Sequence, residues 1–258
     1  MSLMSDFVNQ LPIFNSDIVL FTSDAVRLGY YFHKNKENFD INELLDLILN
    51  KIGTEGTVLF PTYNWNFCKG IPFDYKNTPS QTGSISQIAL KHSAFRRTKH
   101  PIYSWAVAGK DREYLCELNN TDSFAEDSPF AYLYKKNGKN IILDVSMQDS
   151  FTFVHYVEQV IGVSYRYIKD FSANYIDENG MESLQTYSMF VRDYDMNAEV
   201  NLEPLEKYLL DNKIIEETQI AFSRILSIPL NKTFDIIKKD ILNNQSKMIA
   251  TYKGQTIT

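Results

Sequence analysis

Four short apolar runs limit the folds open to this chain more than any other feature of its sequence. They span residues 16–21, 56–61, 102–108 and 140–145, and each ends at glycine, proline or polar residues. Runs of this length, rich in Val, Ile, Leu and Phe, are typical of strands buried on both faces of a sheet. Apolar residues recur at helical spacing over 42–52, which predicts a helix that packs on the sheet. The pattern therefore predicts an α/β fold with a mixed β-sheet sandwiched between helices.

The rest of the chain adds further helices and a pair of antiparallel strands. Alternating segments between 165 and 195, separated by the turn residues 177–180, predict the strands. No repeat, low-complexity segment or Gly/Ser linker divides the 258 residues, so we expect a single domain over 1–258. Helical spacing predicts the additional helices over 84–92, 130–136, 150–162, 203–212 and 232–243.

Charge and cysteine content exclude several classes of function. The formal net charge is −6 and the densest basic run is confined to 96–100, so the chain lacks the clustered Lys and Arg of a nucleic-acid surface. Its two cysteines form no CxxC motif and its four histidines no HxxxH pair, so we expect neither a disulfide scaffold nor a metal site. No apolar stretch approaches the roughly 18 residues of a membrane helix, and the first residues do not resemble a secretory signal. We therefore expect a cytoplasmic protein that binds neither membranes nor nucleic acids.

The strongest candidate for chemistry is the segment from Asp149 to Glu158. Thr152, His155 and Glu158 are spaced three residues apart in this predicted helix and therefore share one face. A carboxylate beside an imidazole fixes the tautomer of the imidazole and keeps it basic, as in a catalytic triad. Such a pair can remove the proton from an amine that attacks an acyl group. The competing interpretation is a His–Glu pair on the helix surface without function, and spacing alone favours it.

Two loops carry small hydroxyl residues that suit phosphate or amide groups. The first ends the strand at 16–21, where a following helix leaves backbone N–H groups free. The second precedes the helix at 84–92, where a glycine allows close backbone approach. An ordinary helix cap is the favoured interpretation of the first loop, and a capped turn explains the second loop at least as well. The candidate residues are Thr22, Ser23, Asp24, Ser80, Gln81, Thr82 and Gly83.

Other segments offer weaker candidates. Arg97, within the basic run, could pair with the phosphates of a coenzyme, although a solvated charged loop is the usual outcome. Tyr63 and Asn64 follow the second strand on a long loop and could stack on a sugar and bond to its hydroxyls, whereas core packing is an equal competitor for Tyr63. Asp127 could form part of an acidic cleft wall, but a helix cap is the favoured interpretation of its segment.

Taken in order, these segments resemble the aminoglycoside 3-N-acetyltransferase family. The resemblance runs from about Asp17 to about Leu226. Two positions depart from the family pattern: Asp144 stands where glycine is usual, and Ser23-Asp24 replaces the usual Ser-Ser. The segments that carry the resemblance are Val19–Asp24, Gly56–Tyr63, Thr78–Gly83, Arg97–Ser104 with Ala108-Gly109, Glu126–Phe130 and Thr152–Glu158.

The resemblance implies acetyl-coenzyme A as donor and direct transfer within a ternary complex. It implies that His155 is the general base and that Glu158 orients it. It also implies that coenzyme A lies near 22–24 and 80–83, and that the fold is a mixed sheet between helices. Thr152 and backbone N–H groups near 80–83 are candidates to stabilise the thioester oxyanion.

The loop after Tyr63 is more similar to branches of the family found in surface-polysaccharide pathways. We therefore expect the acceptor to be an amine on a sugar, specifically a nucleotide-linked amino sugar used for surface glycans. Two alternatives are open: a resistance enzyme that acetylates aminoglycoside antibiotics, and a non-catalytic module that binds coenzyme A or a sugar nucleotide. Each alternative implies a small-molecule partner, and a homodimer is one option for the assembly.

Overall fold

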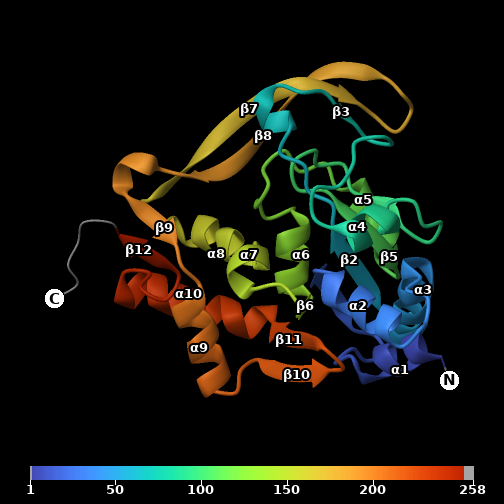
Figure 1. The fold of residues 1–258 in the computed structure, drawn as a ribbon. Helices are drawn as coiled ribbons and strands as arrows, with labels where there is room; N and C mark the ends of the chain where they lie inside the picture. Colours follow the sequence, from blue (N-terminus) through green and yellow to red (C-terminus); the bar gives the residue numbers. More distant parts are fainter. Residues whose placement is uncertain (1, 253–258) are drawn as a thin grey trace.

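A seven-stranded mixed sheet forms the centre of the protein in a computed structural model that describes residues 2–252 (Figure 1). Its strands lie in the order β10-β11-β6-β1-β2-β5-β4. The three central strands are parallel: β6 (Lys139–Leu143), β1 (Ile18–Ser23) and β2 (Thr57–Pro61). The outer strands run antiparallel to their neighbours, and they are β5 (Trp105–Gly109), β4 (Arg96–Arg97), β11 (Ser223–Pro229) and β10 (Glu216–Ile220).

The central strands are buried on both faces because their side chains alternate between two hydrophobic clusters. In β1, Val19 and Phe21 pack into one cluster, whereas Leu20 packs into the other. In β2, Phe60 packs into the same cluster as Val19 and Phe21, whereas Leu59 packs into the same cluster as Leu20. Successive side chains of a strand point to opposite faces, so a sheet covered on both sides requires a continuous apolar run.

Helices cover both faces of the sheet, which confirms the predicted α/β fold with a mixed sheet between helices. One face packs against α1 (Leu3–Gln10), α2 (Val26–Lys34), α3 (Ile41–Ile52) and α4 (Ser84–Ala89). The other face packs against α5 (Arg112–Glu117), α6 (Pro129–Lys135), α7 (Met147–Ser150), α8 (Phe153–Ile161), α9 (Glu203–Asp211) and α10 (Leu230–Asn244).

Polar side chains determine where two of these helices begin. At the start of α3, the carboxylate of Asp40 accepts a hydrogen bond from the backbone N–H of Asn42 at 2.8 Å. At the start of α6, the hydroxyl of Ser128 accepts one from the backbone N–H of Ala131 at 3.2 Å, and Pro129 occupies the first helical position. Both arrangements satisfy N–H groups that a helix leaves unpaired at its start.

A long β-hairpin arches over one end of the molecule (Figure 1). Its strands, β7 (Arg166–Ile176) and β8 (Glu182–Arg192), pair along their full length, which confirms the predicted antiparallel strands. The carboxylate of Asp177 accepts backbone hydrogen bonds in the turn between them. The remaining short elements are β3 (Phe73–Asp74), which pairs with β7, the pair β9 (Ala198–Val200) and β12 (Ala250–Tyr252), and the 3₁₀ turns η1 (Phe67–Lys69) and η2 (Tyr194–Met196).

Several elements differ from the sequence prediction. The helix predicted over 150–162 is present but begins later, at Phe153, because Phe151 adopts φ −86° and ψ 62° and separates α7 from α8. The helix predicted over 84–92 ends earlier, at Ala89. The strand predicted over 102–108 begins later, at Trp105. Helix α1, the edge strand β10 and its neighbour β11 lie where the sequence pattern predicted no element.

Candidate active site

The carboxyl ends of the three parallel strands open into a cavity of about 670 Å³. Ligands of such sheets bind beyond the carboxyl ends, where neighbouring strands connect in opposite directions. Strand β1 lies between β2 on one side and β6 on the other, so the connections on its two sides run in opposite directions. The cavity at its carboxyl end is therefore in the position expected for a ligand. All three strand ends contribute to the wall: Thr22 and Ser23 from β1, Pro61 from β2 with Tyr63 just after it, and Val145 after β6.

Both hydroxyl-rich loops predicted from the sequence contribute to this wall. Their residues on it are Thr22, Ser23, Asp24, Gln81, Thr82 and Gly83. The hydroxyl of Thr82 donates to the carbonyl of Pro61, which links the second loop to the end of β2. Ser80 lies behind the wall, where its backbone N–H donates to Oε1 of Gln87 at 2.7 Å.

Asp24 also stabilises the first loop. Its Oδ1 accepts a hydrogen bond from the backbone N–H of Val26 at 2.9 Å, at the start of α2. The capping interpretation therefore holds for Asp24 alongside its position on the cavity wall.

The His–Glu pair predicted from spacing forms at α8. Nδ1 of His155 lies 2.7 Å from Oε2 of Glu158. The side chain of Glu158 is fully buried, whereas that of His155 is 21% exposed. Two residues beyond the helix surround the same carboxylate: the hydroxyl of Tyr165 donates to Oε1 at 2.9 Å, and Nε of Arg166 lies 2.8 Å from Oε2. Because Nδ1 faces the carboxylate, Nε2 is the nitrogen available to exchange a proton.

Burial and charge determine the protonation of the pair. Burial lowers the pKa of His155 and the guanidinium of Arg166 lowers it further, although Glu158 opposes both effects. Burial alone would raise the pKa of Glu158, but His155, Arg166 and Tyr165 keep that pKa below its usual value. At neutral pH, Glu158 is therefore a carboxylate and His155 a neutral imidazole, the state that a general base requires.

Thr152 lies immediately before α8, one turn from His155, and lines the cavity. Tyr63 lines the same cavity. The ring of Tyr63 packs edge-on against Tyr103 and Trp105, with centroid distances of 4.7 and 5.0 Å. Tyr63 is therefore a core residue that also presents part of its surface to the cavity, and its contact with a sugar stays a prediction.

A second cavity, of about 320 Å³, has His155 in its wall together with residues of β7 and β8. Trp65 lines both cavities, so they approach each other at this residue. Both volumes fall within the range of small-molecule sites, roughly 300–1,000 Å³. The structure thus places a basic imidazole beside two spaces large enough for ligands.

Comparison with known families finds a match over residues 23–241 to the model described as aminoglycoside 3-N-acetyltransferase. The chain belongs to this family. It is accordingly an N-acetyltransferase, as the resemblance implied. No curated protein matches this acetyltransferase.

Solved structures share the fold of this acetyltransferase at low sequence identity. Aminoglycoside acetyltransferase AAC(3)-Xa is 16% identical with a TM-score of 0.76, over 92% of this chain and 91% of its own. AAC-IIIb, in a binary complex with CoASH, is 15% identical with a TM-score of 0.76, over 92% and 94%. The YokD protein from Bacillus subtilis is 18% identical with a TM-score of 0.76, over 95% and 93%.

The comparisons correct the expected acceptor of this acetyltransferase. A nucleotide-linked amino sugar for surface glycans was expected from the loop after Tyr63, and this prediction is wrong. The family model is of aminoglycoside 3-N-acetyltransferases, and AAC(3)-Xa is among the solved structures described as aminoglycoside acetyltransferases. The resemblance of one loop is weaker evidence than a match over most of the chain.

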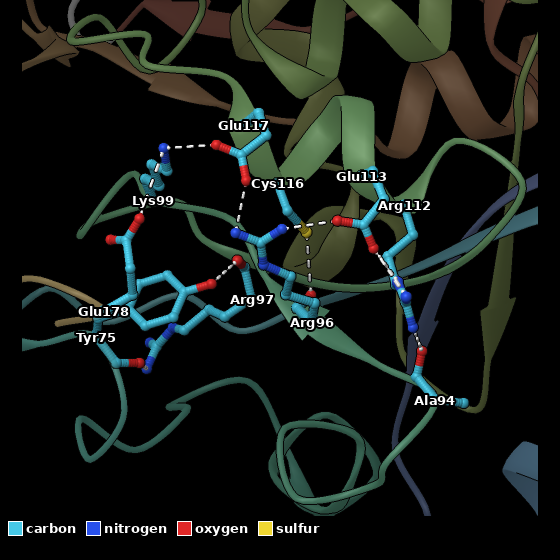
Figure 2. A network of polar contacts seen from close by, with 10 residues as sticks. All are labelled: Tyr75, Ala94, Arg96, Arg97, Lys99, Arg112, Glu113, Cys116, Glu117 and Glu178. Carbon is cyan, nitrogen blue, oxygen red and sulfur yellow. Dashed lines mark hydrogen bonds and ion pairs between the residues drawn. The ribbon is translucent and has the colours of Figure 1, made fainter.

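Arg97 points away from both cavities of this acetyltransferase. It is buried, its Nε donates to the hydroxyl of Ser104 at 3.0 Å, and its guanidinium lies 4.6 Å from the centre of the Phe73 ring. Burial lowers the pKa of Arg97 to about 10. Figure 2 shows that the neighbouring Arg96 is paired as well, with Glu113 at 2.8 Å and with Glu117 at 2.6 Å. The basic run is thus occupied by contacts within the protein rather than presented to phosphates.

Two predicted acceptor contacts also lie outside the cavity walls. Asn64 is buried, its Nδ2 donates to the carbonyl of Pro79 at 2.8 Å, and its Oδ1 accepts from the backbone N–H of Asn66 at 2.9 Å. Its polar atoms therefore stabilise the loop. Asp127 is exposed and lines neither cavity, while the cap of α6 is the adjacent Ser128.

Tyr165 and Arg166, the two additional partners of Glu158, were not predicted from the sequence. The available signal was Gly162, which ends α8 in the left-handed conformation at φ 79° and lets the chain turn back beside its own helix.

A left-handed backbone conformation also accounts for Asp144, which stands where the family usually has glycine. It adopts φ 56°, a region that favours glycine, and its Oδ1 accepts the backbone N–H of Arg224 at 2.9 Å.

Within residues 2–252, no group of three or more His, Cys, Asp and Glu side chains could hold a metal ion. In the same part of the chain, no helix has the length and apolar character needed to cross a bilayer. The predictions of a metal-free and cytoplasmic enzyme stay predictions.

Proposed function

We propose that this chain transfers the acetyl group of acetyl-coenzyme A to an amine of an aminoglycoside. The observation that carries the proposal is the buried Glu158 carboxylate bonded to Nδ1 of His155, in the wall of one cavity and next to another. The match to the aminoglycoside 3-N-acetyltransferase family supports the class of acceptor. The CoASH in the related AAC-IIIb structure supports the donor.

The larger cavity suits the pantetheine arm of coenzyme A. Apolar side chains line one part of it, namely Val26, Phe39, Ile41 and Val145. Hydroxyl and amide groups of the two loops at 22–24 and 81–83 line another part and can bond to the amides of the arm. Bound there, acetyl-coenzyme A supplies an activated acyl group as its thioester.

The proposed role of His155 is to accept the proton that the attacking amine loses. Its Nε2 is free because Nδ1 is bonded to Glu158. Glu158 orients the ring and stabilises the imidazolium once the proton has been transferred. General base catalysis of this kind typically contributes about 10² to 10⁴-fold to the rate.

Thr152 is the proposed stabiliser of the negative charge that develops on the acyl oxygen. It lines the larger cavity one turn from the base, immediately before α8. A hydroxyl held at this position on the backbone needs little reorganisation during the reaction.

The proposal is tested by incubating the purified protein with acetyl-coenzyme A and a panel of aminoglycosides that includes kanamycin, sisomicin and apramycin. Thiol release and mass spectrometry of the product report acetyl transfer. For His155→Asn we expect a loss of kcat of at least about 10²-fold, because Nε2 of the base is removed. Coenzyme A should still raise the Tm of this variant, since His155 is not on the wall of the larger cavity.

Three outcomes would contradict the proposal. Unchanged turnover in His155→Asn would remove the base from the mechanism. Binding of coenzyme A without transfer to any amine would favour the non-catalytic module. No effect of coenzyme A on the Tm of the wild-type protein would remove the donor.

A further inference from the structure

The second cavity, whose wall contains His155, carries a positive charge. Its charged wall residues are Arg166, Lys169 and Arg192, all from the hairpin strands β7 and β8. No Asp or Glu is among the wall residues of this cavity in the described chain. The other wall residues are apolar or aromatic apart from His155.

The three cations differ in how far they are neutralised. Arg166 forms an ion pair with the buried Glu158 at 2.8 Å, which offsets its charge. Arg192 lies directly opposite Arg166 in the strand pairing, an arrangement of like charges that costs free energy. Its guanidinium stacks over the ring of Tyr194 at 4.5 Å and forms a long ion pair with Glu199, at 3.9 Å, which neutralises it only in part.

Lys169 is exposed, and its ammonium lies 5.4 Å from the centre of the Phe171 ring. An aromatic face attracts a cation but does not cancel its charge. Lys169 and Arg192 therefore give this cavity a net positive field, which low-dielectric walls strengthen.

We propose that Lys169 and Arg192 are specificity-determining residues that favour aminoglycosides with few ammonium groups beside the reactive amine. The inference rests on the proposed function, since it assumes that this cavity receives the acceptor. Each additional ammonium group near these cations is repelled, so heavily charged aminoglycosides bind more weakly. The same field favours the neutral form of the reactive amine, which must lose a proton before it attacks.

Charge reversal tests this selection. The variant Lys169→Glu/Arg192→Glu is compared with the wild-type protein on glucosamine, which has one amine, and on sisomicin, which has several. We expect the KM for sisomicin to fall about tenfold in the variant, whereas the KM for glucosamine changes about twofold or less. The matched control is Lys238→Glu/Lys239→Glu, an equal change of charge on the exposed side of α10. This control should leave both KM values unchanged.

Salt dependence gives a second measurement that needs no variant. Added salt screens repulsion between exposed charges, so the wild-type KM for sisomicin should fall as the salt concentration rises. A KM that rises with salt, or an equal change of KM for both acceptors in the variant, would overturn the inference. Acetyl transfer to neither acceptor by the wild-type protein would overturn the proposed function as well, so the two failures are distinguishable.

Discussion

At the scale of single residues, Arg166 stands out because it acts on His155 through Glu158. The guanidinium lies 2.8 Å from Oε2, the same carboxylate oxygen that faces Nδ1 of His155. Its positive charge lowers the pKa of both residues of the pair. Other groups also lie near the imidazole ring of His155. The hydroxyl of Tyr165 bonds to Oε1 of Glu158, and the Phe124 ring packs edge-on against His155. Lys169 and Arg192 line the same cavity as His155. Arg166 is therefore a positioning residue that also keeps the base unprotonated.

Replacing Arg166 with glutamine should move the acidic limb of the kcat/KM profile to higher pH. The base works only when it is neutral, so activity is lost as the pH falls through the pKa of His155. Without the nearby positive charge that pKa rises, and protonation begins at higher pH. We also expect a loss of roughly tenfold in kcat/KM at the optimum, because Glu158 loses a partner. Measuring kcat/KM across pH in both proteins checks this.

Arg166→Lys is the conservative control. It retains the positive charge, so the acidic limb should return toward its wild-type position. If kcat/KM of Arg166→Gln is lower at every pH but its acidic limb lies at the same pH as in the wild-type protein, the role of Arg166 is only structural.

At the scale of elements, the contact between the end of β5 and the start of β2 requires a glycine. Gly109 ends β5 with φ 103°, and a Cβ built there would lie 2.2 Å from the carbonyl oxygen of Gly56. The backbone carbonyl cannot move aside as a flexible side chain would. This close approach lets β5 pair with β2 up to its last residue.

Gly109→Ala should lower the free energy of unfolding by roughly 2–4 kcal/mol, because steric overlap adds to backbone strain. Gly70→Ala is the matched control: Gly70 also has a positive φ, of 76°, but a Cβ there meets no atom within 4 Å. For the control we expect a loss of only about 1 kcal/mol, from the conformation alone. Chemical denaturation of both variants measures the difference, and equal losses would show that the contact with Gly56 is unimportant.

At the scale of the whole molecule, the two hydrophobic clusters share the strands of one sheet. Adjacent residues of β1 and β2 enter opposite clusters, so neither cluster can form without the strands of the other. We therefore propose, as the sequence predicted, that the chain is a single domain.

This proposal predicts one cooperative transition in a calorimetric scan. Coenzyme A should raise the Tm of that transition, because it binds the folded chain alone. Two separate transitions, with only one shifted by coenzyme A, would instead indicate two units that unfold independently. The homodimer stays a prediction that sedimentation can test.

The sequence by itself determined the local features of this protein. The apolar runs predicted the central strands, because two-sided burial excludes polar residues from them. Helical periodicity paired His155 with Glu158, since the two are close whenever that segment is helical. The order of the segments indicated the family, which the family model confirms.

Only the tertiary structure decided which distant residues share a site. Spacing along the chain carries no information on contacts between segments, so Tyr165, Arg166 and the charged wall at Lys169 and Arg192 could not be assigned. Arg97 failed as a candidate for the same reason: its charge is visible in the sequence, but its burial beside Ser104 depends on how the loops pack. Folding brings such residues together through the burial of many weak contacts, which no local pattern specifies.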